Sequence, residues 1–197
     1  MRQVLLLYSS HLIVVQPQVM VERDVAATSK RPGTSKGYGF VEFSHHFHVR
    51  LVSFSCVLVY RDVVVHDCWL LAQALADLEG GTYGVMTCTG LAAITTVIQL
   101  LSPQDTLVIP HDCYGGSYRM FDHLSRRGLF KLVVVDQSDD PALDEAIALK
   151  PKMVLIETPS NPLLRLVDIK AIAAKAKAVG AYVVVDNTFM TPILQQP

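Results

Sequence analysis

From residue 69 to the end, the sequence alternates short apolar runs with amphipathic segments of helix length, and this alternation strongly constrains the fold. Such a pattern is typical of α/β proteins with a parallel sheet. The predicted strands are 83–87, 106–109, 131–135, 153–156 and 181–185, and the predicted helices are 69–79, 90–101, 117–127, 141–149 and 168–179. The connections are short, as right-handed crossovers require. We therefore expect an α/β domain with a mostly parallel sheet over residues 69–197.

Residues 1–68 lack this alternation. Residues 29–39 are rich in Gly, Ser, Lys and Arg, and residues 49–65 form a Val-rich run without helix caps or turn signals. Neither stretch has the periodicity of an amphipathic helix or of a half-buried strand. The sequence therefore predicts an irregular N-terminal segment of uncertain fold over 1–68, with a boundary at about residue 68.

Composition and charge exclude several function classes. With 51% hydrophobic residues the chain can bury a core, and its net charge of -1 gives no overall basic footprint for nucleic acid or anionic membranes. The four cysteines have no metal-ligand spacing, so we expect reduced thiols and no metal site. The apolar run 51–60 is too short to span a membrane, and the run 4–15 lacks a signal-peptide cleavage site. These features predict a cytoplasmic protein with no membrane partner.

Asp186 is the most informative single residue, because it closes the apolar strand 181–185. The loops at the carboxyl ends of parallel strands converge on one crevice, where α/β proteins bind ligands. An acid at that position is expected to face a bound cofactor and to hold a ring nitrogen protonated. The alternative is a helix cap or a structural hydrogen bond.

Three other loops follow predicted strands and carry suitable groups. Gly90 and Leu91 open a helix, where free N–H groups favour a phosphate, although this glycine also suits a tight turn. Tyr114 precedes two glycines and can cover a planar ring, or it is an ordinary half-buried aromatic. Asn161 lies in a proline-stiffened loop, which alternatively only caps the next helix. A phosphate cradle, an aromatic platform, an amide and a carboxylate are together what pyridoxal 5′-phosphate (PLP) needs.

At these loops the chain closely resembles the cystathionine gamma-synthase group of the Cys/Met-metabolism PLP-dependent enzymes. The resemblance covers residues 71–197 and is carried by four ordered blocks, at 74–81, 111–119, 159–165 and 184–189. The block at 111–119, His-Asp-Cys-Tyr-Gly-Gly-Ser-Tyr-Arg, is more similar to the bacterial gamma-synthases than to the gamma-lyases. The implied fold is part of the aspartate-aminotransferase-type (fold type I) PLP domain.

The resemblance implies a role for each site residue. Gly90 and Leu91 would bind the cofactor phosphate through backbone N–H groups, although the family commonly has Met at the second position. Tyr114 would stack on the ring and act as the catalytic residue in proton transfer. Asn161 would bind the ring hydroxyl, Asp186 would hold the ring nitrogen, and Thr188 is counted with the cofactor-binding residues.

The implied reaction is gamma-replacement, in which O-succinylhomoserine or a related ester reacts with cysteine to give cystathionine for methionine biosynthesis. The implied partners are small amino-acid substrates and further copies of the chain, since the family forms tetramers.

The chain also departs from the family pattern. The family's Schiff-base lysine lies beyond the Asp186 loop, and the sequence ends at Pro197 before reaching it. A phosphate-binding Tyr and Arg of the family would fall near Tyr60 and Arg61, but the Gly-Asn-Pro signature is absent there. From these departures we expect a truncated chain that is inactive alone.

Residues 36–43, Lys-Gly-Tyr-Gly-Phe-Val-Glu-Phe, fit the RNP1 strand of an RNA-recognition motif, and residues 19–43 weakly resemble a fragment of that fold. Leu5 to Tyr8 is a faint candidate for its first strand, but the helices of such a domain are missing. RNA binding is therefore an alternative hypothesis, and RNA is not an expected partner. We favour a misjoined, strand-prone segment. A third hypothesis is a catalytically inactive remnant that contacts full-length relatives.

Overall fold

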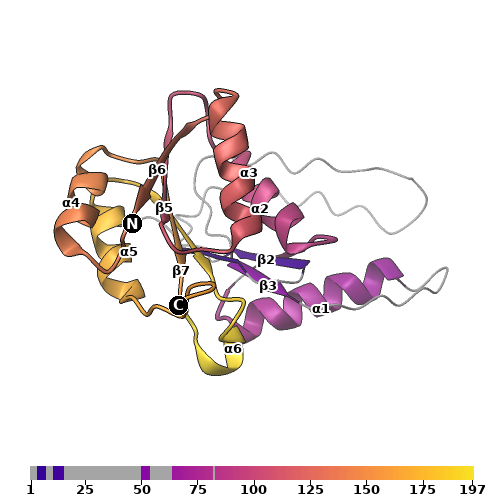
Figure 1. The fold of residues 1–197 in the computed structure, drawn as a ribbon. Coiled ribbons are helices and arrows are strands. Elements are labelled where there is room, and N and C mark those ends of the chain that lie inside the picture. The colour runs from indigo at the N-terminus through magenta and orange to yellow at the C-terminus, as the bar shows by residue number, and fades with distance from the viewer. Residues whose placement is uncertain (1–3, 8–10, 16–49, 54–63, 82) are drawn as a thin grey trace, which may run out of the picture.

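The computed structural model of the protein describes residues 4–7, 11–15, 50–53, 64–81 and 83–197 (Figure 1). The described strands are β1 (Val4–Leu7), β2 (His11–Val15), β3 (Arg50–Ser53), β4 (Tyr83–Met86), β5 (Thr106–Pro110), β6 (Lys131–Val135), β7 (Met153–Glu157) and β8 (Tyr182–Asp186). The described helices are α1 (Val64–Leu78), α2 (Gly90–Ile98), α3 (Gly115–Arg126), α4 (Asp140–Ala148), α5 (Ile169–Ala178) and α6 (Thr191–Leu194).

The strands form one sheet in the order β4-β2-β3-β1-β8-β7-β5-β6. β2 pairs antiparallel with both of its neighbours, and the other pairs are parallel. β4 therefore runs in the same direction as β5, β7 and β8, so the carboxyl ends of these four strands lie at the same edge of the sheet. The predicted α/β fold with a mostly parallel sheet is confirmed.

Helices cover the sheet in two layers. In Figure 1, α4 and α5 lie on one side of β5, β6 and β7, and α2 and α3 lie on the other. α5 shows how the sequence sets such a helix: the Asp168 side chain accepts a hydrogen bond from the Ala171 N–H at 2.9 Å and caps the first turn. Gly180, with φ of 84°, ends it. The buried face between them is made of Ile172, Ala173 and Ala176.

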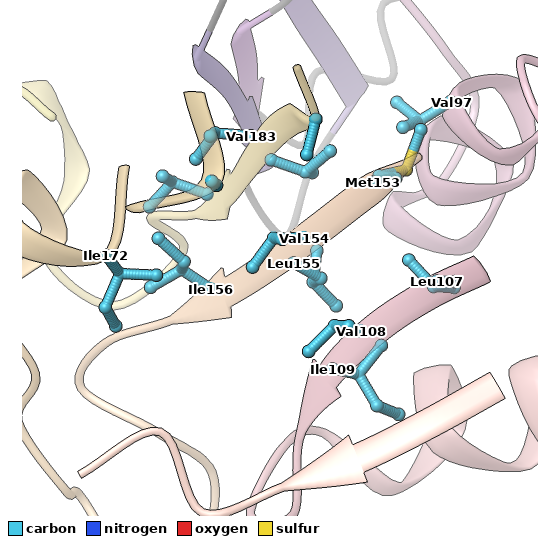
Figure 2. Packing of buried hydrophobic residues seen from close by; sticks show 14 of the residues in the cluster. Val97, Leu107, Val108, Ile109, Met153, Val154, Leu155, Ile156, Ile172 and Val183 are labelled. Carbon is cyan, nitrogen blue, oxygen red and sulfur yellow. The ribbon is translucent and has the colours of Figure 1, made fainter. Parts of the chain in front are cut away.

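The core is centred on β7, in which all five residues are buried. A strand with helices on both faces has no polar side, which explains its continuous apolar sequence. Figure 2 shows Met153 beside Val97 of α2 and, farther along the strand, Ile156 beside Ile172 of α5. Successive β7 side chains therefore join the two helical layers through the sheet, and this core fixes the strand ends that carry the site.

The element boundaries differ from the predicted ones by a few residues. α1 begins at Val64 rather than at residue 69, and α2 ends at Ile98, three residues early. β7 ends one residue later than predicted and β8 is shifted by one residue towards the C-terminus, because Glu157 and Asp186 pair in the parallel ladder. The short α6 was not predicted.

The N-terminal segment contributes to the same sheet. β1 pairs with β8 in parallel register, and β2 pairs with β4, so the three described strands of residues 1–68 lie between two strands of the predicted domain. The division at residue 68 stays a prediction. Of the Leu5 to Tyr8 candidate for an RNA-binding strand, residues 5–7 lie in β1, which is part of this α/β sheet, and Tyr8 lies outside the described residues. Residues 36–43, and the wider stretch 19–43, lie outside the described residues.

Two further observations concern the described residues only. None of their helices is both long and apolar enough to cross a membrane. No three of their His, Cys, Asp or Glu side chains lie together in a way that would hold a metal ion.

Candidate functional site

A pocket of about 420 Å³ opens at the carboxyl edge of the sheet. It is lined by residues from the carboxyl ends of β7 and β8, from the loops after β4, β5, β7 and β8, and from the starts of α2 and α3: Thr89, Gly90, Leu91, Ile94, Tyr114, Ser117, Glu157, Asn161, Asp186, Thr188 and Phe189. The convergence follows from the common direction of these strands. The six residues that the sequence assigned to a cofactor site all line this one pocket.

The start of α2 forms one wall. Thr89 caps this helix: its side-chain oxygen accepts a hydrogen bond from the Ala92 N–H at 3.0 Å, and its carbonyl accepts one from the Ala93 N–H at 3.0 Å. The N–H groups of Gly90 and Leu91 come before these in the first turn, where no helical carbonyl can accept from them. The helix start therefore presents two backbone donors, strengthened by the helix dipole, to an anionic group.

Tyr114 lies at the start of α3 with 47% of its surface exposed. Its ring packs directly over Gly116: a Cβ added to that glycine would lie 2.9 Å from Tyr114 Cζ and closer still to Cε1. The absence of a side chain at Gly116 thus leaves the space that the Tyr114 ring occupies. The ring is half open to the pocket, as a stacking platform requires.

Asp186 is recessed at the end of β8. Its Oδ1 accepts a hydrogen bond from the Thr188 N–H at 3.0 Å. Asp186 therefore does make the structural hydrogen bond that the sequence suggested as an alternative role. Burial raises the pKa of Asp186 to about 6, and the hydrogen bonds from Thr188 partly oppose that rise. At neutral pH the group is therefore a carboxylate that a nearby cation would stabilise.

The loop that carries Asn161 is tied to the loop after β5. The buried Asp112 carboxylate accepts hydrogen bonds from the Ser160 hydroxyl and from the Leu163 N–H, the latter at 3.2 Å. The Ser160 oxygen in turn accepts from the Arg165 N–H at 2.9 Å. These bonds hold Asn161 at the pocket wall, independently of any ligand.

Glu157 is a pocket residue that sequence reasoning missed. It is 7% exposed, and its Oε2 accepts a hydrogen bond from the Tyr114 N–H at 3.0 Å. Burial first, and the neighbouring Asp186 charge second, raise the pKa of Glu157 to about 8. The available signal was that Glu157 ends an apolar strand in the same manner as Asp186, in the neighbouring unit of the sheet.

Ser117 was also missed, and it bears on whether the pocket suits a polar ligand. The side chain is 1% exposed and its hydroxyl has no hydrogen-bond partner among the residues that the structure describes. A buried hydroxyl without a partner costs free energy unless a bound group or water satisfies it. Backbone donors, an aromatic ring, an amide, a carboxylate and this hydroxyl fit a phosphorylated aromatic cofactor. The other residues not predicted are Thr89, Ile94 and Phe189.

Comparison with known proteins identifies the family. The profile of the "Cys/Met metabolism PLP-dependent enzyme" family matches residues 55–197. Cystathionine gamma-synthase from Escherichia coli (strain K12) is 57% identical over 138 residues, which are 70% of this chain and 34% of that protein. Cystathionine beta-lyase from Coxiella burnetii is 43% identical over 126 residues, covering 64% of this chain and 33% of that protein.

Solved structures agree with this assignment. Cystathionine gamma-synthase from Xanthomonas oryzae pv. oryzae, crystallised with aminoacrylate and cysteine, superimposes with a TM-score of 0.67 at 48% identity, covering 74% of this chain and 39% of that chain. The same enzyme with cystathionine covers 90% of this chain at 44% identity, again with a TM-score of 0.67. The matched fold-type I structures confirm the predicted fold class, and the chain spans about a third of the length of the curated relatives it matches. This chain belongs to the Cys/Met-metabolism family of PLP-dependent enzymes.

Proposed function

We propose that the pocket binds PLP through the residues assigned from the sequence. The Gly90 and Leu91 N–H groups hold the phosphate, Tyr114 covers the ring and Asn161 donates to the ring hydroxyl. Asp186 accepts a hydrogen bond from the protonated ring nitrogen, and Thr188 orients Asp186 through its N–H. The observation that carries the proposal is that groups from four loops, distant in sequence, line one pocket of about 420 Å³.

The lining of this pocket also supports a proposal for the reaction that the protein catalyses. When bound, PLP acts as an electron sink for reactions at amino-acid carbons. The chain's part is to keep the Asp186 carboxylate against the ring nitrogen and to present the Tyr114 hydroxyl at the pocket mouth, where it can move a proton to or from a substrate carbon.

The substrates are proposed to be O-succinylhomoserine, or a related ester, and cysteine, with cystathionine as the product. The chain is 57% identical to the Escherichia coli cystathionine gamma-synthase and 43% identical to the Coxiella burnetii beta-lyase. This difference favours the gamma-synthase reaction over the beta-lyase reaction. That an isolated chain of this sequence is inactive stays a prediction.

Titration with PLP tests the proposal. The full chain is mixed with PLP, and binding is followed by the absorbance and fluorescence of the cofactor. Asp186→Asn removes the charge but keeps the shape, and we expect at least about tenfold weaker binding, because a hydrogen bond between charged groups is lost. Asp139→Asn is the matched control, since Asp139 is exposed and its side chain makes no capping bond. Equal affinity of wild type and Asp186→Asn would contradict the assigned role.

We also propose that the chain forms a homo-oligomer. Leu163, Leu164 and Leu166 are 61%, 61% and 73% exposed, which is unusual for three large apolar side chains so close in sequence. Light scattering coupled to size exclusion, at several protein concentrations, would test this. A strictly monomeric chain over that range would refute it.

A further inference from the structure

Glu157 touches both loops that carry the ring contacts of the proposed site. Its Oε2 accepts the Tyr114 N–H at 3.0 Å, and the backbone N–H of Asn161 lies near enough to its carboxyl group to lower the pKa of Glu157. Tyr114 follows β5 and Asn161 follows β7, so the two contacts come from different loops. In the parallel register Glu157 stands directly opposite Asp186. The Glu157 side chain thus lies beside Tyr114, Asn161 and Asp186, which are the three proposed contacts of the cofactor ring.

We propose that Glu157 is a positioning residue, which sets the place of the Tyr114 ring relative to Asn161 and Asp186 by accepting both backbone N–H groups. The inference rests on the proposed function of the pocket and adds to it a residue that does not itself need to touch the ring. Displacing either loop by about 1 Å would spoil the geometry on which binding and orientation depend.

The neighbours of Glu157 explain why a side-chain oxygen is needed here. Pro159 and Pro162 have no N–H, and the Ser160 N–H donates to the Arg165 carbonyl at 3.0 Å, so Asn161 supplies the remaining backbone donor of residues 159–162. A carbonyl oxygen has two lone pairs and can accept from two donors at once. An apolar side chain in its place would leave both N–H groups without this acceptor.

The charges around Glu157 define its protonation state. Asp186 faces it from β8, and Asp112 and Cys113 lie in the loop after β5; among the described residues, the backbone N–H groups of Tyr114 and Asn161 oppose their effect. Burial and these acids raise the pKa of Glu157 to about 8, so the group is mostly neutral at pH 7. A neutral amide of the same shape should therefore replace it near neutral pH.

The first experiment measures positioning without any cofactor. Amide hydrogen exchange is followed by NMR at Tyr114 and Asn161 in wild type, Glu157→Met and Glu157→Gln. The Met side chain fills the space but offers no oxygen, and we expect exchange at both amides to become at least about tenfold faster. Glu157→Gln keeps a carbonyl oxygen and should stay within about threefold of wild type at pH 7. Glu145→Gln is the matched control, because Glu145 is exposed on α4.

Should Glu157→Met fail to fold, Glu157→Ala provides the same comparison with a smaller side chain. Unchanged exchange at both amides in a folded variant without the oxygens would overturn the proposal. Faster exchange spread evenly over the α/β core would also overturn it, because it would indicate general destabilisation.

The second experiment measures PLP binding against pH. The ratio of the wild-type Kd to that of Glu157→Gln should rise by about threefold or more between pH 7 and 9.5, since only the wild-type side chain becomes charged beside Asp186. If the side chain merely fills space, the ratio of the two Kd values should not change with pH. A constant ratio would therefore refute the proposal that a neutral carboxyl group positions the loops.

The two proposals can fail separately. If wild type does not bind PLP, the proposed function fails, while the exchange rates at Tyr114 and Asn161 still decide the positioning role. If wild type binds PLP and Glu157→Met binds it equally well at every pH, with unchanged exchange, only the role of Glu157 is lost.

Discussion

Replacing Gly116 by alanine should displace the Tyr114 ring. The added Cβ would lie 2.9 Å from Cζ and 3.2 Å from Cδ1 of the ring, and closer to Cε1. Carbon atoms in van der Waals contact are about 3.5–4.0 Å apart, so the ring has to move by roughly 1 Å. Gly115→Ala is the matched control, since the Cβ there would meet only the end of the flexible Arg119 side chain, at 3.3 Å.

The expected loss of PLP affinity in Gly116→Ala follows from the overlap between the added Cβ and the ring. Forcing extra atoms into a packed contact typically costs about 1–3 kcal/mol. If this cost has to be met whenever the ring takes up its stacking position, PLP affinity falls by about 5- to 150-fold. Both glycines lie in the first turn of α3, so the effect of alanine on helix propensity is similar at the two positions and cancels in the comparison.

The assay is a PLP titration of wild type, Gly115→Ala and Gly116→Ala at pH 7.5, with circular dichroism to verify that each variant is folded. We expect Gly115→Ala to bind within about twofold of wild type and Gly116→Ala to bind at least about fivefold more weakly. Equal affinities of the two variants, both folded, would refute the argument that Gly116 leaves the space for the ring.

Three further predictions concern stability, each measured as the free energy of unfolding in urea. Burial raises the pKa of Glu79 to about 8, so folding takes up a proton there, and wild-type stability falls as the pH rises from 4.5 to 8. Glu79→Gln does not titrate and should gain on wild type by up to about 5 kcal/mol across that window; a constant difference would contradict the assigned pKa. Asp168→Ala removes the cap on Ala171 and should cost about 1 kcal/mol, whereas a loss below about 0.3 kcal/mol would show that the cap is unimportant. Met153→Ala, at 1% exposure in the core, should cost about 2–5 kcal/mol, and a smaller loss would indicate that the core collapses around the cavity.

Local features of the sequence determined most of the elements after residue 69. Apolar runs such as 153–156 became strands because a fully buried strand needs no polar side, and Asp168 and Gly180 set the ends of α5 by capping and by a positive φ. The parallel sheet then implied that loops after successive strands converge. For this reason Gly90, Tyr114, Asn161 and Asp186 could be assigned to one site before their positions were known.

Tertiary structure alone decided which strands are neighbours and what each loop contacts. That β1 pairs with β8, and that Glu157 stands opposite Asp186, depend on hydrogen bonds between residues far apart in sequence, which no local periodicity encodes. The contact of Gly116 with the Tyr114 ring and the buried Ser117 hydroxyl likewise depend on how α3 leaves the sheet. The sequence therefore determined the elements and the residue types at the strand ends, whereas register and packing determined which of those residues act on one another, because burial and pairing are settled only when distant segments meet.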